Sequence, residues 1–317
     1  MPDPNPTRRG APSVSDYRSV FRSDLFAGQT IIVTGGGSGI GRCTAHELAA
    51  LGAHVVLLGR KLEKVERVKA EILEDGGQAS ALTQDIREES GVAATIAAIL
   101  EQHGSVHGLV NNAGGQYPAP LEAINQKGFE TVVRTNLTGG FLMARELFTQ
   151  HFMKHGGSIV NIVADMWKGM PGMGHSGAAR AGMINLTKTA AVEWARTGVR
   201  VNAVAPGWIA SSGMETYPEA VRSMFMQMTK AVPLKRFGVE AEISAAICFL
   251  LSPAAAFITG QTLCVDGAAP LMPHHWPMPE HDRSLPYNGF HRSTLPADMR
   301  AVTKLDKLPQ SPGEGQD

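Results

Sequence analysis

The chain has 317 residues, with 29 Lys and Arg against 29 Asp and Glu, and three cysteines. This length suits one α/β domain with appendages, and the zero formal charge gives no electrostatic case for nucleic acid or an anionic membrane. The cysteines lack metal-ligand spacing and predict a reducing compartment, and no run approaches the roughly 18 apolar residues of a membrane helix.

The two ends of the chain differ from its middle. Residues 1–26 carry several Pro and Arg residues without an apolar run behind them, so we expect a flexible N-terminal arm and not a secretory signal. Tyr17, Phe21 and Leu25 are expected to anchor this arm. Residues 269–317 are rich in Pro and His with little periodicity, which predicts an ordered or semi-ordered C-terminal extension, long enough to reach a neighbouring subunit. We expect no bound metal there or elsewhere.

Between these ends, apolar runs alternate with helical patterns. Strands are expected near residues 30–34, 54–58, 78–83, 107–111, 158–163, 200–204 and 261–265. Helices are expected near residues 39–51, 62–73, 91–103 and 140–155. This alternation predicts an α/β fold over residues 27–268, a single Rossmann-type doubly wound parallel sheet with helices on both faces.

A glycine-rich turn follows the first predicted strand. Gly35, Gly39 and Gly41 are spaced so that the backbone turns tightly and a helix begins with its free N–H groups aimed at one point. A strand before the turn and a helix after it favour a phosphate cradle for a dinucleotide over an ordinary loop. The predicted cofactor-binding residues of the turn are Gly35, Gly37, Ser38, Gly39, Ile40 and Gly41.

The end of the second predicted strand indicates which nicotinamide cofactor binds. A carboxylate there would bond the ribose hydroxyl of NAD, whereas cations suit the 2′-phosphate of NADP. This chain has Arg60 and Lys61, and Ser38 adds a hydroxyl, so we expect NADP(H). In the alternative interpretation, Arg60 and Lys61 only open a solvated helix.

Five further motifs occur in order along the chain. They are Asp85-Ile86, Asn111-Asn112-Ala113-Gly114, Asn136 in Thr135-Asn136-Leu137, Pro206-Gly207-Trp208-Ile209 and Val265-Asp266-Gly267. Together they resemble the short-chain dehydrogenase/reductase family over residues 25–267. The resemblance implies that Asp85 and Ile86 hold the adenine. It implies that Asn112, Ala113 and Gly114 face the adenosine, and that Pro206, Gly207 and Ile209 face the nicotinamide.

Two segments are similar to a narrower group within that family. Residues 156–162 and 175–182, the latter reading His-Ser-Gly-Ala-Ala-Arg-Ala-Gly, resemble the peroxisomal trans-2-enoyl-CoA reductases. Most members of the wider family use a Tyr and a Lys four residues later. In the family this Lys also binds the nicotinamide ribose. At these positions this chain has Ser176 and Arg180, so the resemblance implies that Arg180 also contacts the cofactor. Of the usual catalytic set only Asn136 is present.

The replacements change the chemistry that the site supports. Arginine donates hydrogen bonds but does not shuttle a proton near neutral pH, and a serine hydroxyl is a poor acid or base by itself. Alcohol oxidation needs a proton acceptor, whereas reduction of a conjugated thioester needs donors for the charge that gathers on its oxygen. Asn136, Ser176 and Arg180 are therefore the candidate catalytic residues, with Asp165 and His175 as candidates for proton transfer. For Asp165 and His175 a structural role is the alternative.

The expected function is NADPH-dependent reduction of a trans-2-enoyl-CoA or similar conjugated acyl substrate. The alternatives are an alcohol or aldehyde dehydrogenase acting on a terpenoid such as citronellol, and a catalytically silent cofactor-binding protein. The last residues lack the tripeptide that directs proteins to peroxisomes, which favours the cytoplasm. A homotetramer or homodimer is implied by the family resemblance.

Overall fold

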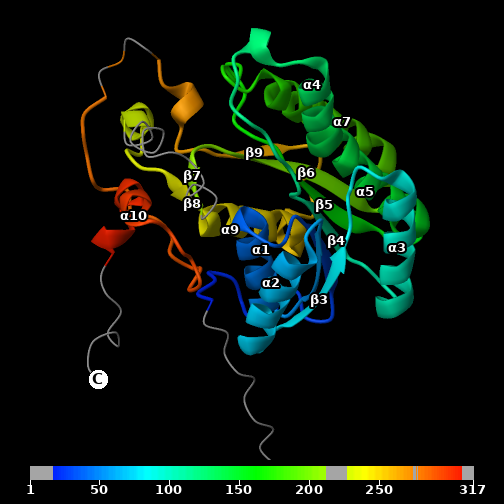
Figure 1. The fold of residues 1–317 in the computed structure, drawn as a ribbon. Helices are drawn as coiled ribbons and strands as arrows, with labels where there is room; N and C mark the ends of the chain where they lie inside the picture. The colour runs from blue at the N-terminus through cyan, green and yellow to red at the C-terminus, as the bar shows by residue number, and fades with distance from the viewer. Residues whose placement is uncertain (1–16, 212–226, 274–275, 277, 309–317) are drawn as a thin grey trace, which may run out of the picture.

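The computed structural model describes residues 17–211, 227–273, 276 and 278–308. Seven parallel strands form one sheet in the order β3-β2-β1-β4-β5-β6-β9 (Figure 1). Their bounds are β1 (Thr30–Thr34), β2 (His54–Gly59), β3 (Gln78–Thr83), β4 (Gly108–Asn111), β5 (Gly157–Ile162), β6 (Val199–Pro206) and β9 (Thr262–Val265). The strand order reverses next to β1, which confirms the predicted Rossmann-type doubly wound sheet.

Helices cover both faces of the sheet (Figure 1). One face carries α1 (Gly39–Ala50), α2 (Leu62–Glu74) and α9 (Glu240–Leu251). The other carries α3 (Glu89–His103), α5 (Gly139–Leu147) and α7 (Gly174–Trp194). Successive residues of a strand point to opposite faces, so Ile31 and Val33 pack beneath α1 while Ile32 packs toward α3.

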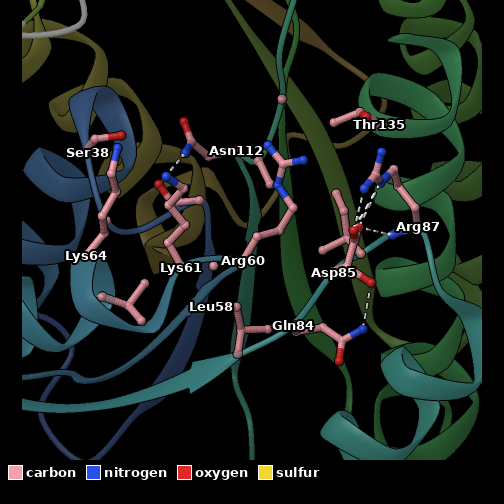
Figure 2. A pocket seen from close by; sticks show the side chains of 17 residues that line it. Ser38, Leu58, Arg60, Lys61, Lys64, Gln84, Asp85, Arg87, Asn112 and Thr135 are labelled. Atoms are coloured by element: carbon pink, nitrogen blue, oxygen red, sulfur yellow. Dashed lines mark hydrogen bonds and ion pairs between the residues drawn. The ribbon is translucent and has the colours of Figure 1, made fainter. Parts of the chain in front are cut away.

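The carboxyl ends of β1 to β4 meet at one edge of the sheet. Parallel pairing places Val33 beside Leu57 and Val110, so the turns after these strands lie next to one another. The cavity drawn in Figure 2 opens at this edge. The fold therefore brings together the glycine turn and the residues that follow β2, β3 and β4.

The helix predicted over residues 140–155 begins earlier and is not uniform. Helical structure runs through α4 (Gln126–Val133), a π-helical segment Arg134–Thr138, α5, a second π-helical segment Phe148–Phe152 and α6 (Met153–His155). A π-helical turn inserts an extra residue and changes which side chains face the sheet, an irregularity that a period of 3.6 residues does not detect. Asn136 lies in the first of these segments.

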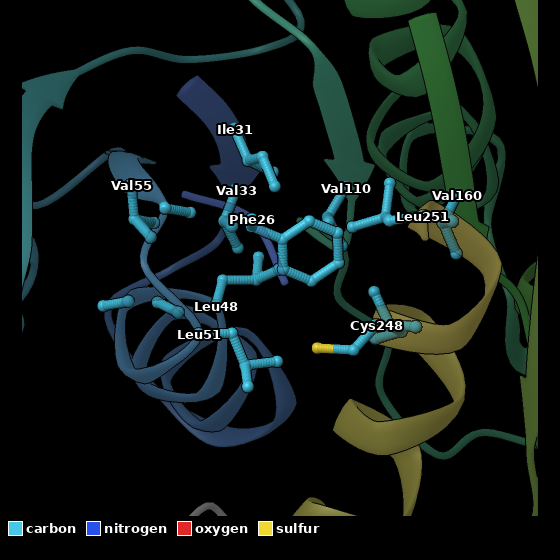
Figure 3. Close-up of a cluster of buried hydrophobic side chains, with 14 of the residues drawn as sticks. Phe26, Ile31, Val33, Leu48, Leu51, Val55, Val110, Val160, Cys248 and Leu251 are labelled. Carbon is cyan, nitrogen blue, oxygen red and sulfur yellow. The ribbon is translucent and has the colours of Figure 1, made fainter. Parts of the chain in front are cut away.

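The described part of the predicted N-terminal arm is packed against the domain. Phe26 is fully buried among side chains of β1, α1 and α9 (Figure 3), and Tyr17 is buried beside Cys43. Tyr17 is one of the expected anchoring residues, and burial of these two aromatic rings holds residues 17–26 against the domain. Residues 1–16 lie outside the described part of the chain.

The described part of the C-terminal extension packs against the Rossmann-type domain of the same chain. Phe290 packs with Tyr17 and Cys43, and Arg292 pairs with Asp75 at 2.5 Å. Further along, α10 (Ala297–Thr303) contacts β7 (Ile209–Ala210), which pairs with β8 (Gly238–Val239). Within the residues described, no helix is long and apolar enough to cross a membrane.

Candidate functional site

Hydrogen bonds join the turn after β1 to the loop after β4. Thr34 Oγ1 accepts hydrogen bonds from the backbone N–H groups of Asn112 and Ala113, both at 3.0 Å, and Asn112 Nδ2 donates to Thr34 O at 3.0 Å. A Cβ at Gly41 would stand 2.4 Å from Asn112 Nδ2, so this close packing requires glycine. Gly35 adopts a left-handed φ of 66°, which favours glycine for a second reason. The predicted cradle is therefore one rigid unit with the Asn112 loop.

The cavity beside this cradle has a volume of about 570 Å³. The predicted cofactor residues that line it are Gly35, Gly37, Ser38, Arg60, Lys61, Asp85, Ile86, Asn112, Ala113 and Gly114. The predicted residues outside its lining are Gly39, Ile40, Gly41, Arg180, Pro206, Gly207 and Ile209. The cavity thus gathers the adenosine half of the predicted site. Ser38 caps α1 without a side-chain hydrogen bond to the helix, which leaves its exposed hydroxyl available to a ligand.

Positive charge dominates the cavity (Figure 2). Four cations line it, namely Arg60, Lys61, Lys64 and Arg87, against a single carboxylate, Asp85. Lys64 and Arg87 were not predicted as site residues, although Lys64 stands one helical turn after Lys61. Excess positive charge beside a glycine turn fits a ligand with several phosphate groups, so these residues fit a nicotinamide dinucleotide.

Asp85 is paired before any ligand binds. Arg87 donates to the carboxylate of Asp85 from Nε at 2.9 Å and from Nη2 at 2.5 Å. These hydrogen bonds hold the pKa of Asp85 below its ordinary value. The carboxylate therefore stays ionised at neutral pH, and the hydrogen bonds from Arg87 use part of its capacity to accept others.

Asn136 is oriented by a backbone group. The N–H of Gly115 donates to Asn136 Oδ1 at 2.8 Å, and Asn136 Nδ2 then faces Ser176 Oγ at 3.4 Å. Ser176 Oγ donates in turn to Gln116 Oε1 at 2.6 Å. The structure thus brings Asn136 and Ser176 together as the sequence analysis expected, and it adds Gln116, which that analysis missed.

Arg180 lies one turn after Ser176 on the same face of α7. Its Nη1 donates to Ile162 O at 2.5 Å, while its Nε has no hydrogen-bond partner among the described residues. Within that part of the chain no carboxylate pairs with it, and burial lowers the pKa of Arg180 to about 10. The guanidinium remains protonated at neutral pH. A buried cation without a counter-ion is suited to an anionic ligand group or a developing oxyanion.

The two proton-transfer candidates differ in position. Asp165 follows β5, where its N–H donates to Pro206 O at 3.0 Å, and burial together with Asp266 raises the pKa of its carboxyl. His175 is fully buried, and its Nδ1 accepts from the N–H of Ser176 at 2.9 Å. Its ring meets the Tyr117 ring edge-on, 4.6 Å between centroids. His175 is thus enclosed as a packing residue, and Asp165 is the more accessible of the two.

The predicted nicotinamide side lies on the neighbouring strands. Pro206 ends β6, Gly207 N donates to Val265 O at 3.0 Å, and Ile209 begins β7. A Cβ at Gly207 would stand 2.6 Å from Asp266 Cα, so the close approach of β6 and β9 requires glycine there. The sequence next has four methionines between residues 214 and 228, and most of this stretch, residues 212–226, lies outside the described part of the chain.

The fold and the site together define a Rossmann-type oxidoreductase that uses a nicotinamide cofactor. The profile of a family described as Enoyl-(Acyl carrier protein) reductase matches residues 35–268. The chain belongs to the short-chain dehydrogenase/reductase family.

Several relatives within that family are acyl-CoA reductases by name. The "Probable 2,4-dienoyl-CoA reductase" of Bacillus subtilis is 37% identical over 78% of this chain and 98% of its own length. A peroxisomal 2,4-dienoyl-CoA reductase of Danio rerio is 34% identical over 81% of this chain and 86% of its own.

Solved structures extend the comparison. A protein of Pseudomonas aeruginosa described as a citronellol catabolism dehydrogenase is 65% identical, with a TM-score of 0.73 over 80% of this chain and 99% of that one. A structure from Beutenbergia cavernae with NADP bound at low occupancy is 32% identical, with a TM-score of 0.73 over 79% and 100% of the two chains.

Proposed function

We propose that this protein is an NADPH-dependent reductase that saturates a carbon–carbon double bond conjugated to an acyl thioester, such as a trans-2-enoyl-CoA. The observation that carries the proposal is the site around Arg180. A buried, protonated guanidinium without a carboxylate partner among the described residues lies one turn from Ser176, where the wider family has Lys and Tyr.

This set of groups suits charge stabilisation better than proton transfer to a carbonyl. Bound NADPH supplies a hydride to the β carbon of such a substrate. Electron density then gathers on the thioester oxygen, which hydrogen-bond donors and a nearby cation stabilise. The α carbon takes its proton from water, so the site needs no acidic tyrosine.

The preference for NADPH is part of the proposal. Arg60, Lys61 and Lys64 stand at the end of β2 and the start of α2, where a 2′-phosphate would be held. A cytoplasmic location and association into a dimer or tetramer also belong to it. The reductase names of the relatives at 34–37% identity support the substrate class.

A second candidate is the oxidation of a branched terpenoid alcohol or aldehyde. The 65% identity with the citronellol catabolism dehydrogenase favours it. This reaction needs a group that takes the hydroxyl proton, and Asp165 is the candidate carboxylate for that role. A catalytically silent cofactor-binding role is the remaining alternative.

One set of assays separates these functions. Purified protein is mixed with NADPH and trans-2-enoyl-CoA or 2,4-dienoyl-CoA substrates of several lengths, straight and branched, and the loss of absorbance at 340 nm is followed. NADH serves as the matched control, and citronellol with NADP⁺ tests the second candidate. We expect NADPH-dependent formation of the more saturated acyl-CoA. Turnover of citronellol alone would reject the reductase, and tight NADPH binding without any turnover would indicate the silent role.

A further inference from the structure

The three predicted hydrogen-bond donors of the site are buried, whereas the neighbouring Gln116 is exposed to solvent. Asn136, Ser176 and Arg180 are 2%, 0% and 9% exposed, respectively. Gln116, in the loop after β4, is exposed, and its Oε1 accepts a hydrogen bond from Ser176 Oγ at 2.6 Å. An incoming substrate oxygen therefore meets Gln116 before it meets Ser176.

One backbone N–H fixes the orientation of the Asn136 amide. Gly115 N can only donate, so the atom of Asn136 that faces it is Oδ1, and Nδ2 must face Ser176. Ser176 Oγ accepts there and donates its own hydrogen to Gln116 Oε1, at a separation of 2.6 Å that is typical of an O–H···O bond and short for an N–H···O bond. Because Oε1 faces Ser176, Nε2 is the other branch of the Gln116 amide, and it has no hydrogen-bond partner among the described residues.

We infer that Gln116 is a further catalytic residue, which donates a hydrogen bond from Nε2 to the carbonyl oxygen of the substrate. Asn136 and Ser176 act as positioning residues that hold the Gln116 amide in this orientation. A donor fixed by a connected network loses little orientation freedom when charge develops on its acceptor. This inference rests on the proposed function, because it assigns a donor to the thioester oxygen.

Substitutions of Gln116 test the donor directly. We expect Gln116→Ala to lower kcat about 10- to 100-fold, in line with the loss of one oxyanion donor, while the Kd for NADPH stays unchanged. Gln116 is not among the residues that line the adenosine cavity, so NADPH binding is the internal control. Unchanged kcat in Gln116→Ala would overturn the inference. Parallel loss of kcat, NADPH affinity and thermal stability would overturn it too, because it would show a structural role.

The pH profile gives a readout that a structural role would not move. In Gln116→Glu, an ionised carboxylate offers no donor and repels the developing oxyanion, whereas a protonated carboxyl donates again. We expect this variant to be poorly active at pH 8 and to recover at least 5-fold at pH 5.5, relative to the wild type at each pH. A constant ratio across this range would contradict the assignment.

A double-mutant cycle tests the positioning role of Ser176. If Ser176 acts by orienting Gln116, the double variant Ser176→Ala/Gln116→Ala loses no more activity than Gln116→Ala alone. If the loss of activity in the double variant equals the product of the losses in the two single variants, Ser176 and Gln116 act independently and the positioning role is rejected.

Failure of the proposed function is separable from failure of this inference. If the wild type does not reduce any enoyl-CoA, binding of hexanoyl-CoA with NADP⁺ present is measured by calorimetry. Binding that weakens 3-fold or more in Gln116→Ala would uphold the contact with the carbonyl. Equal affinity, or no binding by the wild type, would overturn it.

Discussion

Gly114 lies directly against Arg180: a Cβ at Gly114 would stand 2.5 Å from Arg180 Nη2 and 3.0 Å from Asn136 Oδ1. The Asn-Asn-Ala-Gly motif after β4 thus forms a wall of the cofactor cavity, and its glycine leaves the room that the Arg180 guanidinium occupies. Arg180 occupies its position because residue 114 has no side chain.

The first prediction follows from this contact. Gly114→Ala should displace the guanidinium of Arg180 and lower kcat/KM about 100-fold, with a change in Tm of only a few degrees. If displacement of Arg180 is the cause, the double variant Gly114→Ala/Arg180→Ala should be no less active than Arg180→Ala. Steady-state kinetics of the three variants measures this, and wild-type activity in Gly114→Ala would remove Arg180 from the reaction.

The second prediction concerns the choice of cofactor. Arg60→Ala and Lys64→Ala should each weaken NADPH binding about 5- to 10-fold, because each removes a cation from the cavity, and should leave NADH binding unchanged. Lys69→Ala, on the same helix but paired with Glu66 outside the cavity, is the matched control. Fluorescence titration with both cofactors provides the measurement. Equal losses for NADPH and NADH would argue against a 2′-phosphate at these residues.

The third prediction is a loss of stability in mild acid. Burial lowers the pKa of His54, His103 and His151 below the ordinary value of histidine. The unfolded chain therefore binds these protons more readily than the folded chain. The contribution of these neutral histidines to the free energy of unfolding is fully present above about pH 6.5, and it is lost as the pH falls through their folded-state pKa values.

Urea denaturation at pH 7.5 and pH 5.5 measures this effect. We expect a lower midpoint at pH 5.5 and a smaller drop in the variant His54→Gln/His103→Gln, in which two of the three groups no longer titrate. These two rings lie 4.5 Å apart, and both contact the hydroxyl of Ser80. An identical drop in the variant and the wild type would exclude this pair as the cause.

The fourth prediction concerns assembly. Strand β9 pairs with β6 on one side and forms the edge of the described sheet, where Leu263 is 38% exposed and nearby Phe257 is fully exposed. An open edge beside apolar side chains favours association with a second copy. Leu263→Lys/Phe257→Ser should reduce the mass measured by light scattering, whereas Leu73→Lys, at an exposed leucine of α2, should not. A monomeric wild type would contradict the prediction.

Local patterns along the chain determined the fold class and half of the site. The glycine spacing of residues 35–41 specifies a tight turn through backbone geometry alone, and the apolar alternation specifies strands buried on both faces. Both features depend on neighbours within a few residues, so they can be read without the tertiary structure. The adjacent Arg60 and Lys61 and the i, i+4 pair Ser176 and Arg180 are local in the same sense.

Only the tertiary structure decided which distant groups meet. Gln116 and Ser176 are 60 residues apart, and the contact of Gly114 with Arg180 joins the loop after β4 to the helix α7. Arg87 and Lys64 enter the cofactor cavity because β2, β3 and β1 end at the same edge of the sheet. Such contacts depend on strand order and on the burial of side chains from separate elements. The physical reason is that packing, and not any spacing along the chain, brings these residues within hydrogen-bond distance.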